Sequence, residues 1–246
     1  MILFVFEGQK AEPMVFKSLE QLFFSGEEVR MVKCSYDLPT LYKRLKDNGY
    51  DLFRSLPLSE NGIEVPEEAR LDTLFSQIFL FFDYDFQNRM GIDRLNGILK
   101  EMLDFFDNET DNGKLYVNYP MVESLKYTKT LPDAHYWRYT VSRAICVEHR
   151  FKSEAETFAC AEAKGYKFID LSRTSEDIVK NNWMLLKAQN VRKANYIISG
   201  KNAWPANKED VSQHALFKAQ NAIYVSTNDE VAILNSFPIF IYDYLK

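Results

Sequence analysis

Two apolar runs that both stop at an acidic residue constrain the fold of this chain more than any other feature. The first run, ILFVF at residues 2–6, ends before Glu7, and the second, IFLFF at residues 78–82, ends before Asp83. A strand that is apolar at every position is buried on both faces, which is typical of parallel sheets covered by helices. The two runs therefore predict neighbouring strands at the centre of an α/β domain.

Segments with helical spacing of apolar residues alternate with these strands along the first half of the chain. We expect helices at residues 10–24, 37–56 (with a break at Asn48-Gly49) and 92–108, and further strands within residues 26–34 and 114–120. This alternation predicts a mainly parallel sheet flanked by helices, which we assign to residues 1–125.

The second half of the chain, residues 126–246, is predicted to be a largely helical portion packed on the sheet. The segments with helical character are residues 153–171, 175–198, 211–225 and 229–245. The last of them is strongly apolar and contains Pro238, where we expect a kink because proline lacks the N–H that a helix interior needs.

Composition excludes several classes of protein. Apolar residues make up 46% of the 246 residues, yet no stretch is long and apolar enough to cross a bilayer, so no membrane location is expected. The first residues lack the basic start and cleavage site of a signal peptide. The three cysteines, Cys34, Cys146 and Cys160, are scattered and odd in number, which favours reduced thiols in the cytoplasm.

Charge is distributed unevenly along the chain. Residues 1–120 carry 13 basic and 21 acidic side chains, whereas residues 121–220 carry 16 basic and 11 acidic ones. The basic second half could face a phosphate backbone. The alternative is the ordinary variation of charge along any chain, and the sequence leaves both open.

Three acids are expected to share one edge of the sheet. Glu7 and Asp83 follow predicted parallel strands, whose carboxyl ends form the edge at which α/β sheets bind ligands. Asp85 comes two residues after Asp83, so an extended chain would present both carboxylates on the same side. Carboxylates so placed repel unless a cation joins them, and hard oxygen ligands suit Mg²⁺ or Mn²⁺. Alternatively, the acids only mark where the strands reach the surface.

This order of motifs resembles the Toprim domain of topoisomerases, primases and OLD-type nucleases. The resemblance rests on a hydrophobic strand ending in Glu7-Gly8, then a helix, then a hydrophobic strand ending in Asp83-x-Asp85. It implies that Glu7 acts as the acid/base group and that the two aspartates bind magnesium, with Glu7 as a further metal ligand.

Two longer segments, VFEGQKAEP and VNYPMVESLK, are more similar to the RloB-like group of Toprim-related bacterial proteins. Asn118, Pro120 and Glu123 match that group, although Tyr119 is inserted and Ala11 stands where the group usually has threonine. The resemblance covers about the first half of the chain. It implies a role in phage defence, assistance to catalysis from Glu123, and an ATPase as a possible partner protein.

Basic and aromatic residues are interleaved in the segment YTKTLPDAHYWRYTVSR. Such a mixture can stack bases and hold phosphates, but it can equally form a core face with a solvated rim. The basic candidates for nucleic-acid binding here are Lys126, Lys129, Arg138 and Arg143. Residues 190–208 repeat the mixture with Arg192, Lys193 and Lys201.

The expected function is a divalent-metal-dependent nuclease that cleaves phosphodiesters in DNA or RNA. Two alternatives remain open: a non-catalytic Toprim-like module that binds nucleic acid or a partner, and a nucleotide-sugar glycosyltransferase that uses the Asp-x-Asp motif. The sequence contains neither a Walker A lysine motif nor GxGxxG, so nucleotide sites of those types are not expected.

Overall fold

The computed structural model describes residues 1–66 and 71–245 and divides the chain into two compact units. The first unit comprises residues 1–83 and 90–116, and the second comprises residues 84–89 and the chain from residue 117 onward. The sequence predicts a boundary at 125/126. In the structure the chain passes into the second unit after Tyr116, and the loop of residues 84–89 also belongs to the second unit.

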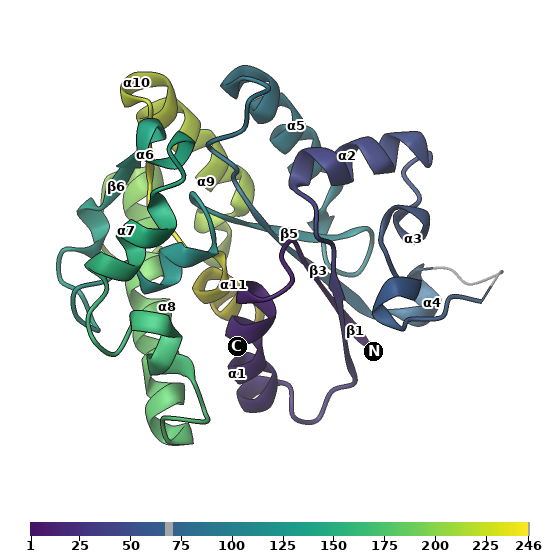
Figure 1. The fold of residues 1–246 in the computed structure, drawn as a ribbon, viewed down its shortest axis with the longest axis horizontal. Coiled ribbons are helices and arrows are strands. Elements are labelled where there is room, and N and C mark those ends of the chain that lie inside the picture. Colours follow the sequence, from purple (N-terminus) through teal and green to yellow (C-terminus); the bar gives the residue numbers. More distant parts are fainter. Residues whose placement is uncertain (67–70, 246) are drawn as a thin grey trace. The chain divides into compact units, whose positions relative to one another are not determined.

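A five-stranded sheet with the order β2-β1-β3-β5-β4 organises the first unit (Figure 1). Its strands are β1 (Ile2–Phe6), β2 (Val29–Lys33), β3 (Gln77–Asp83), β4 (Asp107–Asn108) and β5 (Gly113–Asn118), the last of which leads into the second unit. Strand β1 pairs in parallel with both β2 and β3, whereas the short β4 is antiparallel to β5. The predicted mixed α/β class, with a mostly parallel sheet, is confirmed.

The central strand β1 is buried on both faces, as its continuous apolar sequence predicts. All five of its residues are buried, and Phe4 packs against Phe16 of helix α1 with ring centroids 4.1 Å apart. Phe4 also lies 5.3 Å from Phe79 of β3. Each fully buried phenylalanine contributes about 1.5–3 kcal/mol to the stability of the fold, because its apolar surface is removed from water. The contacts between these rings therefore favour β1 and β3 as neighbours.

The helices of the first unit follow the predicted segments in part: the chain breaks near residues 48–49 as expected, but the helix expected over 92–108 ends at Phe105 and residues 107–108 form β4. The helices are α1 (Ala11–Phe23), α2 (Leu38–Asp47), α3 (Leu52–Ser55), α4 (Leu71–Leu74) and α5 (Ile92–Phe105). Asp37 caps α2 by accepting the N–H of Thr40 at 3.0 Å, and Gly49 in the left-handed region separates α2 from α3. The hydroxyl of Tyr42 donates to Glu101 at 2.6 Å and so links α2 to α5.

The second unit is largely helical, as expected. Its helices are α6 (Arg143–Val147), α7 (Phe151–Phe158), α8 (Glu176–Ser199), α9 (Gln213–Ala219), α10 (Ser226–Asn228) and α11 (Ser236–Tyr244), with a π-helix at Gln220–Val225 and 3₁₀ turns at Val122–Lys126 and Tyr136–Arg138 among others. Within the described chain, no helix combines the length and the apolar character that crossing a membrane would require.

The prediction of one helix over residues 229–245 is wrong in its first half. Residues Glu230–Ala232 form strand β7, which pairs antiparallel with β6 (Thr140–Ser142). Helix α11 begins only after Asn235, whose side chain accepts the N–H of Phe237 at 3.1 Å. Pro238 therefore lies in the first helical turn, where its missing N–H costs nothing, and it does not interrupt a helix.

A buried hydrogen-bond network joins the end of β5 to the start of α11 within the second unit. Asn118, which is fully buried, accepts from the backbone N–H of Ser236 at 3.0 Å and from its hydroxyl at 2.8 Å. Asn235 donates to the carbonyl of Val122 at 3.1 Å and to the hydroxyl of Ser124 at 3.0 Å. Because buried polar groups are costly when unpaired, this network specifies one arrangement of the three segments.

We predict that Asn118→Ala lowers the free energy of unfolding by about 2–4 kcal/mol, because Ser236 loses a buried acceptor for two donors. Asn108→Ala is a matched control, since exposed Asn108 also accepts a backbone N–H and a hydroxyl, both from Thr110, at 3.0 and 2.9 Å. Urea unfolding followed by circular dichroism should show that the control loses less than about 1 kcal/mol in free energy of unfolding, because water replaces the lost acceptor. Equal losses in the two variants would contradict a special role for the buried network.

Candidate functional site

The first two predicted site residues meet at the carboxyl edge of β1 and β3. Phe6 is in register with Phe81, and the backbone N–H of Glu7 continues the ladder by donating to the carbonyl of Phe81 at 3.1 Å. The side chain of Glu7 then turns toward β3, where its Oε2 accepts the backbone N–H of Asp83 at 2.9 Å. The prediction that these strands are parallel neighbours is confirmed, and the carboxylate of Glu7 reaches the backbone of Asp83.

A third acid, Glu12, lies at the same turn, although its position in the sequence does not predict a role for it. Glu12 is in the first turn of α1, is only 4% exposed, and its Oε1 accepts the N–H of Gly8 at 3.1 Å. A Cβ at position 8 would lie 2.6 Å from Oε2 of Glu12. A side chain at position 8 would therefore displace the end of the Glu12 side chain from this position. The sequence signal for this residue is the acid that precedes Pro13 in EGQKAEP.

The chain beyond β2 flanks Glu7 on the other side. The N–H groups of Cys34 and Ser35 donate to the carbonyls of Phe6 and Glu7, both at 2.8 Å. Burial raises the pKa of the Cys34 thiol to about 12, and the negative charge of Glu7 acts in the same direction, against a hydrogen bond from Tyr36 that lowers it. Cys34 is therefore a protonated neighbour of the acidic edge at neutral pH and is not a nucleophile.

Asp85 does not follow the geometry that the sequence analysis assumed. Strand β3 ends at Asp83, and Asp85 has a left-handed φ of 55°, so the period-two argument that placed both carboxylates on one side is wrong. Asp85 belongs to the second unit, where its two carboxylate oxygens accept from the side chains of Gln87 and Asn88. These bonds stabilise a tight turn, which is a structural use of this aspartate.

Glu123, predicted to assist catalysis, lies in the second unit within the 3₁₀ turn Val122–Lys126. It is only 4% exposed, and its Oε1 lies 3.0 Å from Nζ of Lys152 on α7. The ion pair neutralises a buried carboxylate, so the local geometry supports a role in anchoring the turn to α7.

The four predicted basic contacts lie in different environments of the second unit. Lys126 is buried and forms an ion pair with Glu156, so the structure does not favour it as a phosphate contact. Lys129 and Arg138 are exposed, with their cations over the rings of Phe158 and Trp137 at 4.9 and 4.5 Å. Arg143 is partly buried and donates to the carbonyl of Phe86 at 3.2 Å.

The aromatic residues of the same segment mostly form core. The ring of Tyr127 stacks on Phe158 at 4.1 Å and on Phe151 at 5.7 Å, and Tyr136 is buried with its hydroxyl donating to Asn190 at 2.8 Å. Trp137, beside Arg138, and Tyr139 remain partly exposed. The alternative interpretation of this segment, a core face with a solvated rim, holds for most of its residues.

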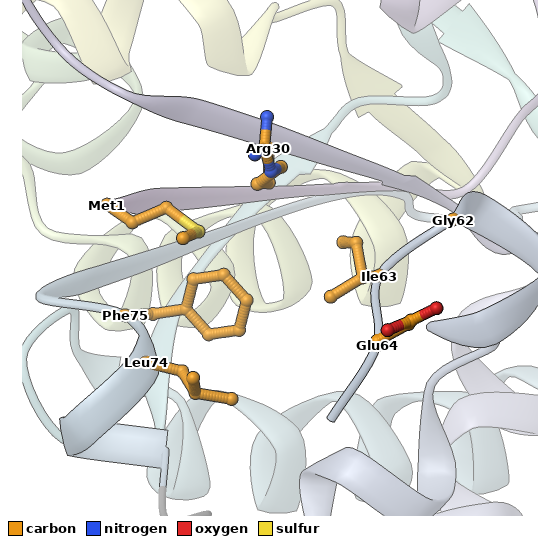
Figure 2. Close-up of a pocket in the computed structure, with 7 residues that line it drawn as sticks. All are labelled: Met1, Arg30, Gly62, Ile63, Glu64, Leu74 and Phe75. Carbon is orange, nitrogen blue, oxygen red and sulfur yellow. The ribbon is translucent and has the colours of Figure 1, made fainter. Parts of the chain in front are cut away.

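The first unit also contains a pocket of about 260 Å³ near the amino ends of the strands (Figure 2). Met1, Ile63, Leu74 and Phe75 form its apolar part, with Arg30 and Glu64 at its sides. Arg30 is paired with Glu28 at 3.1 Å. Since ligands of parallel sheets bind at the carboxyl ends of the strands, this pocket is at the opposite edge from the one expected to be functional.

No family model, no curated protein and no solved structure matches this chain. Among the described residues, no three histidine, cysteine, aspartate or glutamate side chains form a group that could hold a metal ion together. The candidate site consists of Glu7, whose carboxylate reaches the backbone of Asp83, with Glu12 on the turn that follows Glu7.

The buried thiol beside Glu7 generates a testable prediction. At pH 8, Cys34 should react with a thiol reagent such as Ellman's reagent far more slowly in the folded protein than in the unfolded protein. The reason is that burial raises the pKa of its thiol from 9.0 to about 12. Since the unfolded thiol ionises near 9.0 while the folded one keeps its proton, this group should make the fold less stable as pH rises above 9.

Peptide mass spectrometry after timed labelling identifies the modified cysteine and separates Cys34 from Cys146 and the partly exposed Cys160. Rapid labelling of Cys34 in the folded protein at pH 8 would show that the carboxyl edge opens to solvent. Cys34→Ser is the control, because it should flatten the loss of stability above pH 9 if the thiol is the cause.

Proposed function

We propose that this chain is a divalent-metal-dependent nuclease of the Toprim type, with its reaction centre at the carboxyl edge of β1 and β3. The observation that carries the proposal is the hydrogen bond at 2.9 Å from the backbone N–H of Asp83 to Oε2 of Glu7. This bond joins the carboxylate of Glu7 to the backbone of Asp83 at the end of the adjacent parallel strand, and the resemblance to the Toprim domain implies that both residues act at this edge.

The donor chemistry of this edge suits Mg²⁺ or Mn²⁺. Magnesium is usually held by one or two carboxylates and completes its shell with water and substrate phosphate, so it does not require a cluster of three protein ligands. Asp83 and Glu7 supply two hard oxygen donors on adjacent strands. Glu12, on the turn that follows Glu7, adds negative charge and favours a cation at this edge further.

Each residue would have a distinct part in phosphodiester cleavage. The metal, when bound, would neutralise charge on the phosphate oxygens. Glu7 is held in one orientation by the N–H of Asp83 and would accept the proton of the attacking water. Asp83 would bind the cation, while Gly8 allows the backbone and Glu12 to approach closely.

Other parts of the proposal rest on the resemblance alone. These are metal binding by Asp85, catalytic assistance from Glu123, a role in bacterial phage defence and an ATPase partner, whereas the cytoplasmic location is proposed from the scattered cysteines. The non-catalytic module and the glycosyltransferase remain the competing functions, and the experiments below distinguish them from a nuclease.

Asp83→Asn should weaken Mn²⁺ binding by on the order of tenfold or more, because an amide lacks the charge of the carboxylate ligand. In EDTA the same variant should unfold at an equal or slightly higher temperature, since one of two neighbouring carboxylates is gone. Calorimetric titration with Mn²⁺ and thermal unfolding test both effects. Asp104→Asn on α5, an exposed acid paired with Lys100 at 3.0 Å, is the control. Equal affinity in the Asp83 variant and the parent would exclude Asp83 as a ligand.

Glu7→Gln should abolish metal-dependent cleavage of nucleic acid while leaving the fold intact. The amide oxygen of glutamine can still accept the N–H of Asp83, but it cannot take a proton. The assay incubates the full chain with single- and double-stranded DNA and RNA over a range of Mg²⁺ and Mn²⁺ concentrations, followed by denaturing gels.

Glu28→Gln is the matched control, because Glu28 lies at the amino end of β2 and pairs with exposed Arg30. Undiminished cleavage in Glu7→Gln would remove Glu7 from the reaction. Metal-dependent hydrolysis of a nucleotide sugar by the parent, with no cleavage of any nucleic acid, would favour the glycosyltransferase. Nucleic-acid binding without metal affinity would favour the non-catalytic module.

A further inference from the structure

The three tryptophans of the second unit differ sharply in exposure. Trp183 lies in the core and is fully buried, whereas Trp204 is 43% exposed and Trp137 is partly exposed. Both outer tryptophans are next to successive residues of α8, the long green helix in Figure 1. The ring of Trp137 lies 4.7 Å from that of Tyr196, and Asn195 binds the loop that carries Trp204.

Trp204 lines a pocket that the loop after α8 forms against the last turns of that helix. The pocket has a volume of about 420 Å³, within the range of about 300–1,000 Å³ that is usual for ligand sites. The residues that line it are Asn195, Ile198, Ser199, Lys201, Ala203, Trp204, Ala206 and Asp210.

Side-chain hydrogen bonds hold this loop in place. Asn195 donates to the carbonyl of Ala203 at 2.9 Å, and the hydroxyl of Ser199 donates to the carbonyl of Asn195 at 2.8 Å. The same hydroxyl accepts the N–H of Lys201 at 3.3 Å. The loop that forms the pocket is therefore held against α8 by these side-chain hydrogen bonds.

Exposed cations lie near both outer tryptophans, and Trp204 also has acids close by. Its ring lies 5.6 Å from that of Tyr242, whose pKa is raised by burial and by Asp243, Asp210 and Glu209. Lys201 is exposed and forms no ion pair with any other residue in the described part of the chain, and the guanidinium of Arg138 lies 4.5 Å over the ring of Trp137. Arg192, one turn before Tyr196 on α8, is also exposed. The one acid of the pocket, Asp210, accepts the N–H of Asn207 at 2.9 Å in a capping box.

We propose that this surface, defined by Trp137, Arg138, Tyr196, Lys201 and Trp204, binds single-stranded nucleic acid. A base stacks on Trp204 in the pocket, and Lys201 and Arg138 contact the phosphates. Stacking requires an exposed base face, which a single strand offers and a duplex does not. Exposed tryptophan with unpaired cations matches that chemistry, whereas a protein partner would favour a wider apolar surface.

The proposal rests on the proposed nuclease function for its biological meaning, because it names the form of substrate that the second unit would hold. Binding itself is independent of cleavage and of metal. It can therefore be measured in EDTA, where failure of the surface and failure of the nuclease are separate results.

The experiment measures fluorescence anisotropy of a labelled oligothymidine of about 15 nucleotides, long enough for a typical single-strand site, with the full chain in EDTA. Trp204→Ala should weaken binding by on the order of tenfold to a hundredfold, while Trp204→Phe keeps most of the affinity because it keeps a ring. Lys201→Ala should lower the slope of log affinity against log salt by about 0.7, and Lys201→Arg should not.

Matched controls come from the other end of the same helix. Ile178→Ala removes an apolar side chain that is 54% exposed, and Lys180→Ala removes an exposed cation, so neither should change binding. A duplex of the same length should compete weakly, and polyglutamate should not compete.

Three results would overturn the proposal: affinity unchanged in Trp204→Ala, equal binding of duplex and single strand, or displacement of the oligonucleotide by polyglutamate at equal charge. The last would assign the surface to an acidic peptide. Strong binding in EDTA with no metal-dependent cleavage would keep this surface and remove the proposed nuclease. Metal-dependent cleavage without binding at this surface would keep the proposed nuclease and remove the proposed single-strand site.

Discussion

The pairing of β1 between β2 and β3 is the constraint on which the candidate site depends. Because the three strands are parallel, their carboxyl ends fall at one edge, and the register of Phe6 with Phe81 brings Glu7 within hydrogen-bond distance of the N–H of Asp83. A shift of register by one residue would move every side chain of β1 to the opposite face. The buried rings around Phe4 oppose such a shift, so the packing that stabilises the sheet also positions the acids.

The second unit is organised by buried polar groups rather than by a continuous sheet. Asn118 and Asn235 hold the start of α11 against the segment that follows β5. Lys193 on α8 is fully buried and donates to the carbonyls of Tyr136 and Tyr139 at 3.0 and 2.6 Å, and burial holds its pKa well below the usual range. Such groups tolerate few alternative packings, since each lost partner leaves a desolvated donor or acceptor.

The charged residues that the sequence marks as candidates fall into two groups in the structure, one buried and one exposed. Lys126, Lys193 and Glu123 are in the interior and are neutralised or hydrogen-bonded there. The exposed cations Arg138 and Lys201 lie beside Trp137 and near Trp204. Interleaved basic and aromatic residues thus serve two purposes in one unit: some build the core, and others form the surface that we propose for single-stranded nucleic acid.

The sequence by itself determined the central strands, the extents of α1 and α8 and the meeting of Glu7 with the end of β3, because continuous apolar runs and helical spacing act locally and parallel strands share an edge. It did not determine the roles of Asp85, Glu12 or the chain at 229–235. A left-handed turn at Asp85 depends on its bonds to Gln87 and Asn88. The strand β7 depends on pairing with β6, far away in sequence, and the position of the buried Glu12 involves its hydrogen bond to the N–H of Gly8. Only the tertiary structure decides these features, because each is set by a partner that no local pattern reveals.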